Sequence, residues 1–406
     1  MKLVEIPIEK MEEYRLRLIF EGYKWDPQFK DHNTIARHVL VLSKDEHEEI
    51  KRLTLELDAE TTAAEEFLNS NISYAKKLRM TPKVARLLKR MRGYERERNV
   101  RLRRYDFHPV SEGGYSVSEV NSDVPGGYAE GSLMPLIAKE TLLSSASSEK
   151  PAHSYSYTDF GECYVKAIKK IVRPGGRIAL VHCTSYSDDR QVMQFIGDRL
   201  QMEGFEVIYM AADGLKFVDK KAISVLHGLE GEVDFILRFT PVEWLCKMRF
   251  KSWTGYFDTV TPACNHPISI YAQTKRFPLV WDILEANGIS MATWRKLLPE
   301  TLPVRARLAQ EKQGFVYKPV YGRVGEDISI KEACEENEYK KILRKVRLMP
   351  QNYVAQKKFI SREVDGKHVC IGSFTINGEH CGYYARVSDT PRIDSNAADI
   401  PVLIEE

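Results

Sequence analysis

The stretch Lys318-Pro319-Val320-Tyr321-Gly322-Arg323-Val324-Gly325 decides the fold of this 406-residue sequence. It places a lysine at the end of a predicted strand, directly before a glycine-rich loop. The backbone N–H groups of such a loop and a lysine ammonium suit the phosphates of ATP. A Gly-x-x-Gly spacing also occurs in plain turns, so the loop needs a second motif before it indicates a nucleotide site.

That second motif lies about 200 residues earlier, in Arg104-Tyr105-Asp106 and Glu119-Val120-Asn121. Residues 100–122 predict two strands joined by a turn at residues 112–114. Because side chains alternate along a strand, Asp106, Glu119 and Asn121 are expected on one face. Three oxygen-bearing side chains suit Mg²⁺, a hard cation that prefers carboxylates and phosphate oxygens. Alternatively, they are outward-facing residues of an ordinary hairpin.

Local signals predict the surrounding elements. Ser43-Lys44-Asp45-Glu46 is a capping-box pattern that opens a long amphipathic helix to about Leu68. A second helix is expected from Pro82 to Arg92, where Gly93 ends it. The Ser-rich residues 144–155 predict a surface linker.

From Gly176 onward the pattern predicts a parallel α/β unit. IALVHC, FEVIYM and VDFILRF are its predicted strands, and RQVMQFIGDRLQMEG is its helix. Asp188 and Asp189 are expected either to cap this helix or to contact substrate. Farther along, residues 275–298 read as helical, and residues 315–320, 353–359, 368–377 and 380–387 as strands, the last two joined at Asn377-Gly378.

Composition narrows the functional class. Sixty basic and 57 acidic residues give a net charge of +3, which argues against a dedicated polyanion-binding protein. The seven cysteines are scattered without a C-x-x-C motif, which favours a reduced cytoplasm over a disulfide frame or a zinc site. No apolar run reaches the length of a membrane span, and the charged N-terminus does not resemble a secretory signal.

Several segments together resemble one known family, the glutathionylspermidine synthases. In the C-terminal half they are Lys318 to Gly325, Tyr353-Val-Ala-Gln-Lys-Lys-Phe, Ile371-Gly-Ser-Phe-Thr-Ile-Asn-Gly-Glu, Ala385-Arg386 and Asp399-Ile-Pro-Val-Leu-Ile. Arg104-x-Asp106 with Glu119-x-Asn121-x-Asp123 resembles the family's metal motif. The resemblance spans roughly residues 40–404, in the same order.

This resemblance implies an α/β (α+β) chain with an ATP-grasp fold of permuted strand order. It implies an N-terminal helical region on the catalytic core, a first ATP-grasp part with the metal motif, a pre-ATP-grasp-like parallel α/β substrate domain, and a second ATP-grasp part with the nucleotide site. We expect these regions at residues 1–98, 99–143, 156–265 and 266–406.

The resemblance also implies a role for individual residues. The implied Mg²⁺ ligands are Asp106, Glu119 and Asn121. The implied ATP contacts are Lys275, Lys318, Val324, Gly325, Gln356 and Phe359. Arg104 and Arg386 are the implied cations at the reacting centre. The implied substrate contacts are Asp188, Asp189 and Asp399, acidic groups suited to a cationic amine. Asp123 is a candidate for supporting the metal motif from behind.

The activity implied by the resemblance is ATP-dependent ligation of a carboxylate to an amine, with glutathione or a similar peptide as the acid and a polyamine as the amine. A carboxylate is a poor electrophile, and phosphorylation to an acyl phosphate gives it a leaving group. Phosphoryl transfer needs positioning and charge neutralisation more than covalent help, which suits Mg²⁺, two lysines and two arginines. The expected partners are small molecules, a peptide or amino-acid carboxylate and an amine.

The sequence departs from the family at the acid site. Val124 and Gly126 stand where the glutathione-specific enzymes place hydroxyl residues, and neither has a side-chain donor. The backbone N–H groups of Gly126 and Gly127 remain possible contacts for a carboxylate. The identities of acid and amine therefore stay open.

Two alternatives to a ligase follow from the same residues. One is a non-catalytic sensor that binds ATP in the same cleft. The other is a nucleic-acid-associated factor, because Lys76 to Arg104 contains thirteen lysines and arginines. Glu95 and Glu97 interrupt that basic run, which also suits the solvated face of a helix.

Overall fold

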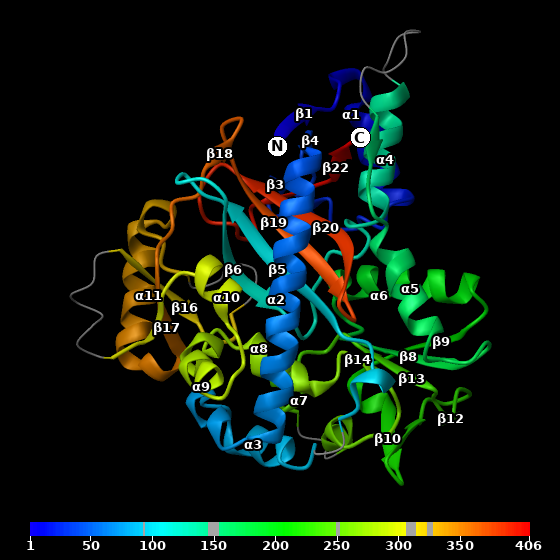
Figure 1. Ribbon diagram of the computed structural model, residues 1–406. Helices are drawn as coiled ribbons and strands as arrows, with labels where there is room; N and C mark the ends of the chain where they lie inside the picture. The colour runs from blue at the N-terminus through cyan, green and yellow to red at the C-terminus, as the bar shows by residue number, and fades with distance from the viewer. Residues whose placement is uncertain (92–93, 145–153, 249–251, 306–313, 323–327) are drawn as a thin grey trace.

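The computed structural model describes residues 1–91, 94–144, 154–248, 252–305, 314–322 and 328–406. Within them the chain forms a mixed α/β structure around one large antiparallel sheet (Figure 1). Its strand order is β21-β20-β19-β5-β6, and β18 pairs with β19. The bounds are β5 Leu102–Pro109, β6 Tyr115–Asn121, β18 Glu363–Val364, β19 Lys367–Ile376, β20 Glu379–Ser388 and β21 Ala398–Ile400.

This sheet joins the two distant motifs of the sequence. The predicted hairpin is β5–β6, in which Arg104 lies opposite Asn121, and β5 pairs antiparallel with β19, where Asp106 lies opposite Gly372. The β5–β6 register shifts between Tyr105 and Phe107, an irregularity of the kind that redirects side chains near functional sites. The predicted β19–β20 hairpin is also confirmed.

The long predicted helix is α2 (Lys44–Ser70), which crosses the front of the sheet in Figure 1 and packs against β19. Its capping box is present, with Glu46 N–H donating to the Ser43 hydroxyl and the Glu46 carboxylate accepting from Ser43 N–H. Its buried face carries Ile50, Leu53 and Leu57. Each such side chain contributes about 1.5–3 kcal/mol when it leaves water.

Buried ion pairs also hold α2 to the sheet. Arg103, 2% exposed, donates to Asp58 at 2.8 Å and to Glu65 at 2.7 Å, and Arg101 donates to both oxygens of Glu65 at 2.9 Å. Burial alone would lower the pKa of the Arg103 guanidinium, but Glu65 and Asp58 hold it well above its usual range. These arginines belong to the basic run considered for nucleic acid, and they face the interior instead of a partner.

The parallel α/β unit is confirmed, with strand order β14-β13-β8-β9 and all neighbours parallel. It lies beside the large sheet, at the lower right of Figure 1. The hydrophobic core of this unit includes Phe160, Phe195 and Phe235, all under 2% exposed. The bounds are β8 Arg177–Val181, β9 Glu206–Met210, β13 Phe235–Arg238, β14 Ala263–Cys264, α5 Phe160–Lys169 and α6 Ser187–Met202.

A three-stranded antiparallel sheet of order β15-β17-β16 carries the lysine of the opening motif. The segment expected to be helical at 275–298 is broken into short helices around Asn287 and Gly288. The bounds are β15 Thr301–Pro303, β16 Phe315–Pro319, β17 Tyr353–Lys357, α9 Trp281–Ala286, α10 Ala292–Leu297 and α11 Glu336–Leu348.

A four-stranded sheet of order β1-β4-β22-β7 lies near both marked ends of the chain (Figure 1). It gives the N-terminal region strands where only helix was expected. The bounds are β1 Lys2–Glu5, β4 His38–Leu42, β7 Tyr155–Ser156, β22 Val402–Glu405, α1 Met11–Phe20 and α4 Leu133–Ser144.

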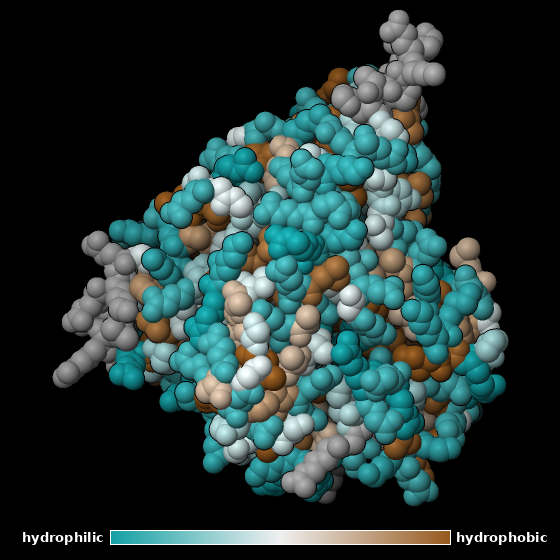
Figure 2. Space-filling view, viewed as in Figure 1, coloured by the Kyte–Doolittle hydropathy of each residue, from teal (hydrophilic) through white to brown (hydrophobic). Residues whose placement is uncertain are grey.

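The remaining elements are short. They are β2 Gln28–Phe29, β3 His32–Asn33, β10 Leu215–Val218, β11 Lys221–Ser224, β12 Gly231–Glu232, α3 Pro82–Leu88, α7 Val242–Leu245 and α8 Ile270–Gln273. Helix α3 is shorter than expected, and Arg92 and Gly93 lie outside the described residues, as does most of the predicted linker. Among the described helices, none combines the length and apolarity needed to cross a membrane. The face in Figure 2 is mostly hydrophilic, with scattered apolar side chains.

Candidate active site

One cavity of about 670 Å³ brings the two motifs together. Its wall contains every predicted site residue that the structure describes. These are Arg104, Asp106, Glu119, Asn121, Asp188, Asp189, Lys275, Lys318, Gln356, Phe359, Arg386 and Asp399. The other two, Val324 and Gly325, lie outside the described residues.

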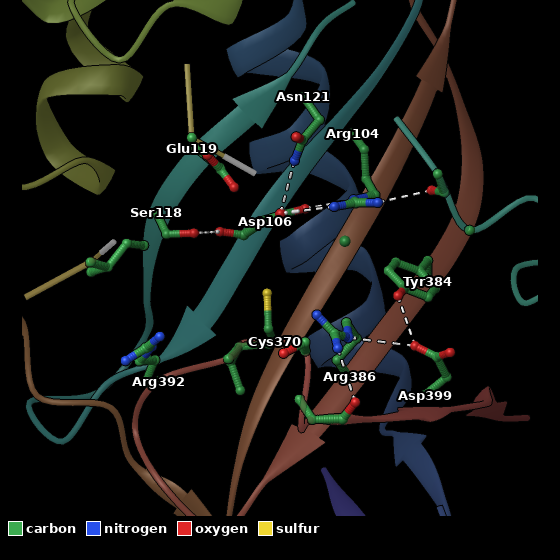
Figure 3. A pocket seen from close by; sticks show the side chains of 18 of the residues that line it. Arg104, Asp106, Ser118, Glu119, Asn121, Cys370, Tyr384, Arg386, Arg392 and Asp399 are labelled. Carbon is green, nitrogen blue, oxygen red and sulfur yellow. Dashed lines mark hydrogen bonds and ion pairs between the residues drawn. The ribbon is translucent and has the colours of Figure 1, made fainter. Parts of the chain in front are cut away.

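Asp106 on β5 is the hub of the predicted metal motif (Figure 3). Arg104 donates to it through Nε at 2.7 Å and Nη2 at 3.1 Å, and the Asn121 amide donates at 3.0 Å. Arg104 also donates to the Gly126 carbonyl at 2.8 Å and lies over the Tyr384 ring. Burial alone would lower the pKa of the Arg104 guanidinium, but Asp106 raises it. These contacts fix the Arg104 fork in the cavity wall.

Glu119 on β6 pairs with the other predicted lysine. Lys275 Nζ lies 2.6 Å from the Glu119 carboxylate and donates to the Gly322 carbonyl at 2.7 Å. Burial alone would raise the pKa of Glu119, but Lys275, Lys318 and Arg104 lower it. Lys275 therefore links the metal motif to the start of the glycine-rich loop.

Lys318 on β16 is 6% exposed and donates to the Ser118 carbonyl at 3.2 Å. Burial lowers the pKa of its ammonium to about 8, against the opposing pull of Glu119. Nearby His108 is also buried, and burial with the Lys318 charge lowers its pKa to about 3. His108 is thus a neutral wall residue that bonds to the Ser118 hydroxyl.

The residues present fit a magnesium ion. Two carboxylates and one amide oxygen line the same wall, and Mg²⁺ commonly takes few protein ligands and completes its shell with water and phosphate oxygens. No group of three or more His, Cys, Asp or Glu gathers as a metal cluster among the described residues. A metal held by Asp106, Glu119 and Asn121 would therefore depend on ligands from a bound nucleotide.

Gln356 and Phe359 lie beyond Lys318. Gln356 is 4% exposed and donates to the Thr301 hydroxyl at 3.0 Å. The Phe359 ring centroid lies 5.2 Å from that of His108. Val316 and Ile330 add apolar wall beside them. Apolar side chains next to buried cations suit a purine base next to its phosphates.

On the far side of Cys370, Figure 3 shows Tyr384, Arg386 and Asp399 from β20 and β21. The Tyr384 hydroxyl donates to Asp399 at 2.7 Å, and Arg386 Nε lies 3.5 Å from the same carboxylate. Arg386 also donates to the Asp394 and Ala397 carbonyls. These contacts hold Arg386 in the wall of the cavity.

Asp188 and Asp189 lie in the first turn of α6, as expected, but they do not cap it. The N-cap residue is Tyr186, and it has no side-chain cap bond. Asp189 accepts from Cys183 N–H at 3.4 Å. Burial, with the charge of Asp26, raises the pKa of Asp188. Both carboxylates line the cavity.

The predicted supporting role of Asp123 is wrong. Asp123 pairs with Arg238 and accepts from Val242 N–H at 2.8 Å and the Ser269 hydroxyl at 2.7 Å. Both members of the Asp123–Arg238 pair are almost fully buried. This carboxylate therefore ties the first motif to the parallel α/β unit, away from Asp106.

The sequence did not reveal three further charged residues of the cavity, Lys24, Asp26 and Glu130. Lys24 is 4% exposed and pairs with Asp399 at 2.7 Å, Asp26 at 2.8 Å and Glu130 at 3.5 Å. No periodicity or spacing marks these residues, because their contacts join three separate parts of the chain.

Comparisons with known proteins identify the family of the chain. The family model described as glutathionylspermidine synthase preATP-grasp matches residues 6–405. The chain belongs to this family, whose name indicates a synthetase-like function.

Solved structures give the fold. A glutathione synthetase-like effector from Globodera pallida, in its apo form, aligns with a TM-score of 0.61 and 11% identity over 97% of each chain. A putative gamma-glutamylcysteine synthetase from Methylobacillus flagellatus aligns with a TM-score of 0.47 and 11% identity, over 84% of this chain and 86% of that one. No curated protein matches the sequence. The fold is thus ATP-grasp-related and glutathione synthetase-like, and the permuted strand order stays a prediction.

Proposed function

We propose that this chain is an ATP-dependent ligase that joins the carboxylate of a peptide or amino acid to an amine through an acyl phosphate. One observation carries the proposal: four of the predicted cations line one cavity with the carboxylates Asp106 and Glu119, although they come from distant segments. The cations are Arg104, Lys275, Lys318 and Arg386. Such a set suits the charge of a triphosphate and of a transferring phosphoryl group.

Three of these cations are already engaged with groups that a nucleotide would replace. Arg104 is held by Asp106, Lys275 by Glu119 and Lys318 by the Ser118 carbonyl. On ATP binding, phosphate oxygens would become the new partners of Arg104, Lys275 and Lys318. Asp106, Glu119 and Asn121 would hold Mg²⁺, which supplies charge neutralisation on the phosphates when bound. The Arg104 fork can contact two oxygens of a planar phosphoryl group at once.

The reaction then has two steps. A substrate carboxylate oxygen attacks the γ-phosphorus, the bond to the β-phosphate oxygen breaks, and ADP leaves. The amine, after giving its ammonium proton to a nearby carboxylate, next attacks the acyl carbon. The bond to the phosphate oxygen breaks, the amide forms, and the leaving phosphate takes the surplus proton from the nitrogen. Arg386 lies where it can stabilise charge at the acyl group, and Asp188, Asp189 and Asp399 form an acidic end for the amine.

A substrate screen tests the proposal. Purified protein with Mg²⁺ and ATP is offered small thiol peptides and other short peptides, each with and without amines, and ADP release and product mass are measured. We expect ADP release that needs both an acid and an amine, together with the mass of the amide. ATP binding without ADP formation across the whole panel would favour the non-catalytic sensor instead.

The cellular setting is part of the proposal. All seven cysteines are free, which suits a reducing cytoplasm. The partners proposed are small molecules, and the inward-facing arginines of the basic run argue against nucleic acid.

A further inference from the structure

The acidic end of the cavity already holds an ammonium group of the protein itself. Lys24 Nζ lies 2.7 Å from Asp399, 2.8 Å from Asp26 and 3.5 Å from Glu130. Burial alone would lower the pKa of this ammonium, but Asp399, Glu130 and Asp26 hold it well above its usual range. Lys24 is thus charged at neutral pH, and it pairs with Asp399, the carboxylate that Arg386 also contacts.

The chain is shaped to deliver Lys24 to this position. After α1 the backbone turns sharply: Tyr23 has φ of +56°, and Lys24 N–H donates to the Leu18 carbonyl at 2.9 Å. A Cβ at Gly22 would lie 2.7 Å from that same carbonyl oxygen, so the turn accepts only glycine there. Left-handed backbone at a bulky residue is uncommon and is kept where the surroundings enforce it.

Side chains on either side of Lys24 fix the turn to helix α6. The Tyr23 hydroxyl donates to Asp198 at 2.6 Å, and Trp25 N–H donates to the Gln191 side chain at 3.1 Å. Both acceptors lie on the helix that carries Asp188 and Asp189. The turn therefore holds Lys24 between the acidic end of the cavity and the parallel α/β unit.

The acidic end retains capacity for another cation. Glu130 is 8% exposed, lines the cavity, and its Oε2 atom has no hydrogen-bond partner in the described structure. Burial raises the pKa of Glu130 to about 7, although Lys24 opposes this and Asp399 and Asp26 add to it. Five carboxylates line this end of the cavity (Asp26, Glu130, Asp188, Asp189 and Asp399), together with the cations Lys24 and Arg386. One more ammonium would satisfy Glu130.

We infer that Lys24 determines amine specificity by placing an ammonium group of the protein between Asp399 and Asp26. The acceptor amine of this ligase then presents a single ammonium group, to Glu130, and is not a polyamine. The inference rests on the proposed function, since it names the class of its amine substrate. A polyamine would need two or more of these carboxylates at once, and its second ammonium would have to displace Lys24. Like charges in that small space repel strongly.

The test compares spermidine binding by the wild-type protein and by Lys24→Ala. Removal of the lysine opens an ammonium-sized space beside three carboxylates, so we expect Lys24→Ala to bind spermidine at least tenfold more tightly. Spermidine should also raise the melting temperature of this variant by about 1–3 °C, and the rise should saturate with concentration. The melting temperature of the wild type in spermidine should equal its melting temperature in NaCl of the same ionic strength.

Two variants control for fold and charge. Lys169→Ala removes a lysine from an exposed pair with Glu203, and its spermidine affinity should equal that of the wild type. Lys24→Met keeps much of the side-chain volume and replaces Lys24→Ala if circular dichroism shows that the alanine variant does not fold. Equal spermidine affinity in the wild type and the folded Lys24 variant would overturn the inference.

An activity arm separates this inference from the proposed function. In the ligase screen, the wild type should use acceptors with one ammonium, and the Lys24 variant should gain turnover with spermidine. If no protein releases ADP with any acceptor, the proposed function fails, and the binding comparison still decides the role of Lys24. Faster turnover of spermidine by the wild type than of monoamines would contradict the inference directly.

Discussion

Raising the pH should weaken ATP binding, because Lys318 loses its charge earlier than an ordinary lysine. Burial lowers the pKa of its ammonium to about 8 in the free protein. A bound phosphate stabilises the charged form, so binding above pH 8 must take up a proton. Affinity then falls by about tenfold per pH unit, and between pH 7.5 and pH 9.5 we expect a loss of about 25-fold.

Calorimetric titration with a non-hydrolysable ATP analogue measures this loss. Titrations in buffers of different ionisation enthalpy should also show uptake of nearly one proton at pH 9. His108 does not interfere, because its pKa is lowered to about 3 and it stays neutral throughout. The nucleotide phosphates are already ionised in this range.

Lys318→Arg is the matched control. Arginine remains charged at every pH used, so the affinity of this variant should stay flat between pH 7.5 and pH 9.5. An equally steep loss in Lys318→Arg, or a flat profile in the wild type, would show that Lys318 does not hold the phosphates.

Three further changes test other parts of the cleft. Asp106→Asn should abolish ADP release while circular dichroism remains that of the wild type, because the carboxylate lines the cavity and its loss removes a proposed magnesium ligand; full turnover would end that assignment. Asp188→Asn should raise the KM for the amine more than the KM for ATP, and an unchanged amine KM would leave Asp188 without a substrate role. Arg238→Met leaves the buried Asp123 carboxylate unpaired and should cost about 3–5 kcal/mol of unfolding free energy in urea titrations; a loss under 1 kcal/mol would mean that Asp123 finds another partner.

The sequence predicted best what depends on neighbouring residues. The capping box at Ser43 and the turn at Asn377-Gly378 need only a few consecutive side chains, and both are present. Both Asn377 and Gly378 have positive φ, as the tight hairpin requires. Helix α6 was predicted from its periodicity, but its N-cap was misplaced because adjacent polar residues offer several equivalent starts.

The prediction that these residues meet in one site came from the family resemblance and not from a local sequence pattern. Nothing in the spacing of Glu119 and Lys275 places their side chains 2.6 Å apart. The departures are also long-range: Asp123 is drawn to Arg238, and Lys24 reaches Asp399 from the other end of the chain. Such partners depend on which strands meet, and a single sequence does not encode that in any window.

The pairing of β5 with β19, and of β4 with β22, orders events during synthesis. A chain emerging from the ribosome exposes the β5–β6 hairpin long before residue 367 exists, and β4 waits for its parallel neighbour until β22 (Val402–Glu405) has been made. The amino-terminal half must therefore remain partly unpaired throughout translation, with strand edges open to other chains. Nascent chains of this protein are expected to need chaperone protection, and the cavity cannot assemble before Asp399 in its wall has been made.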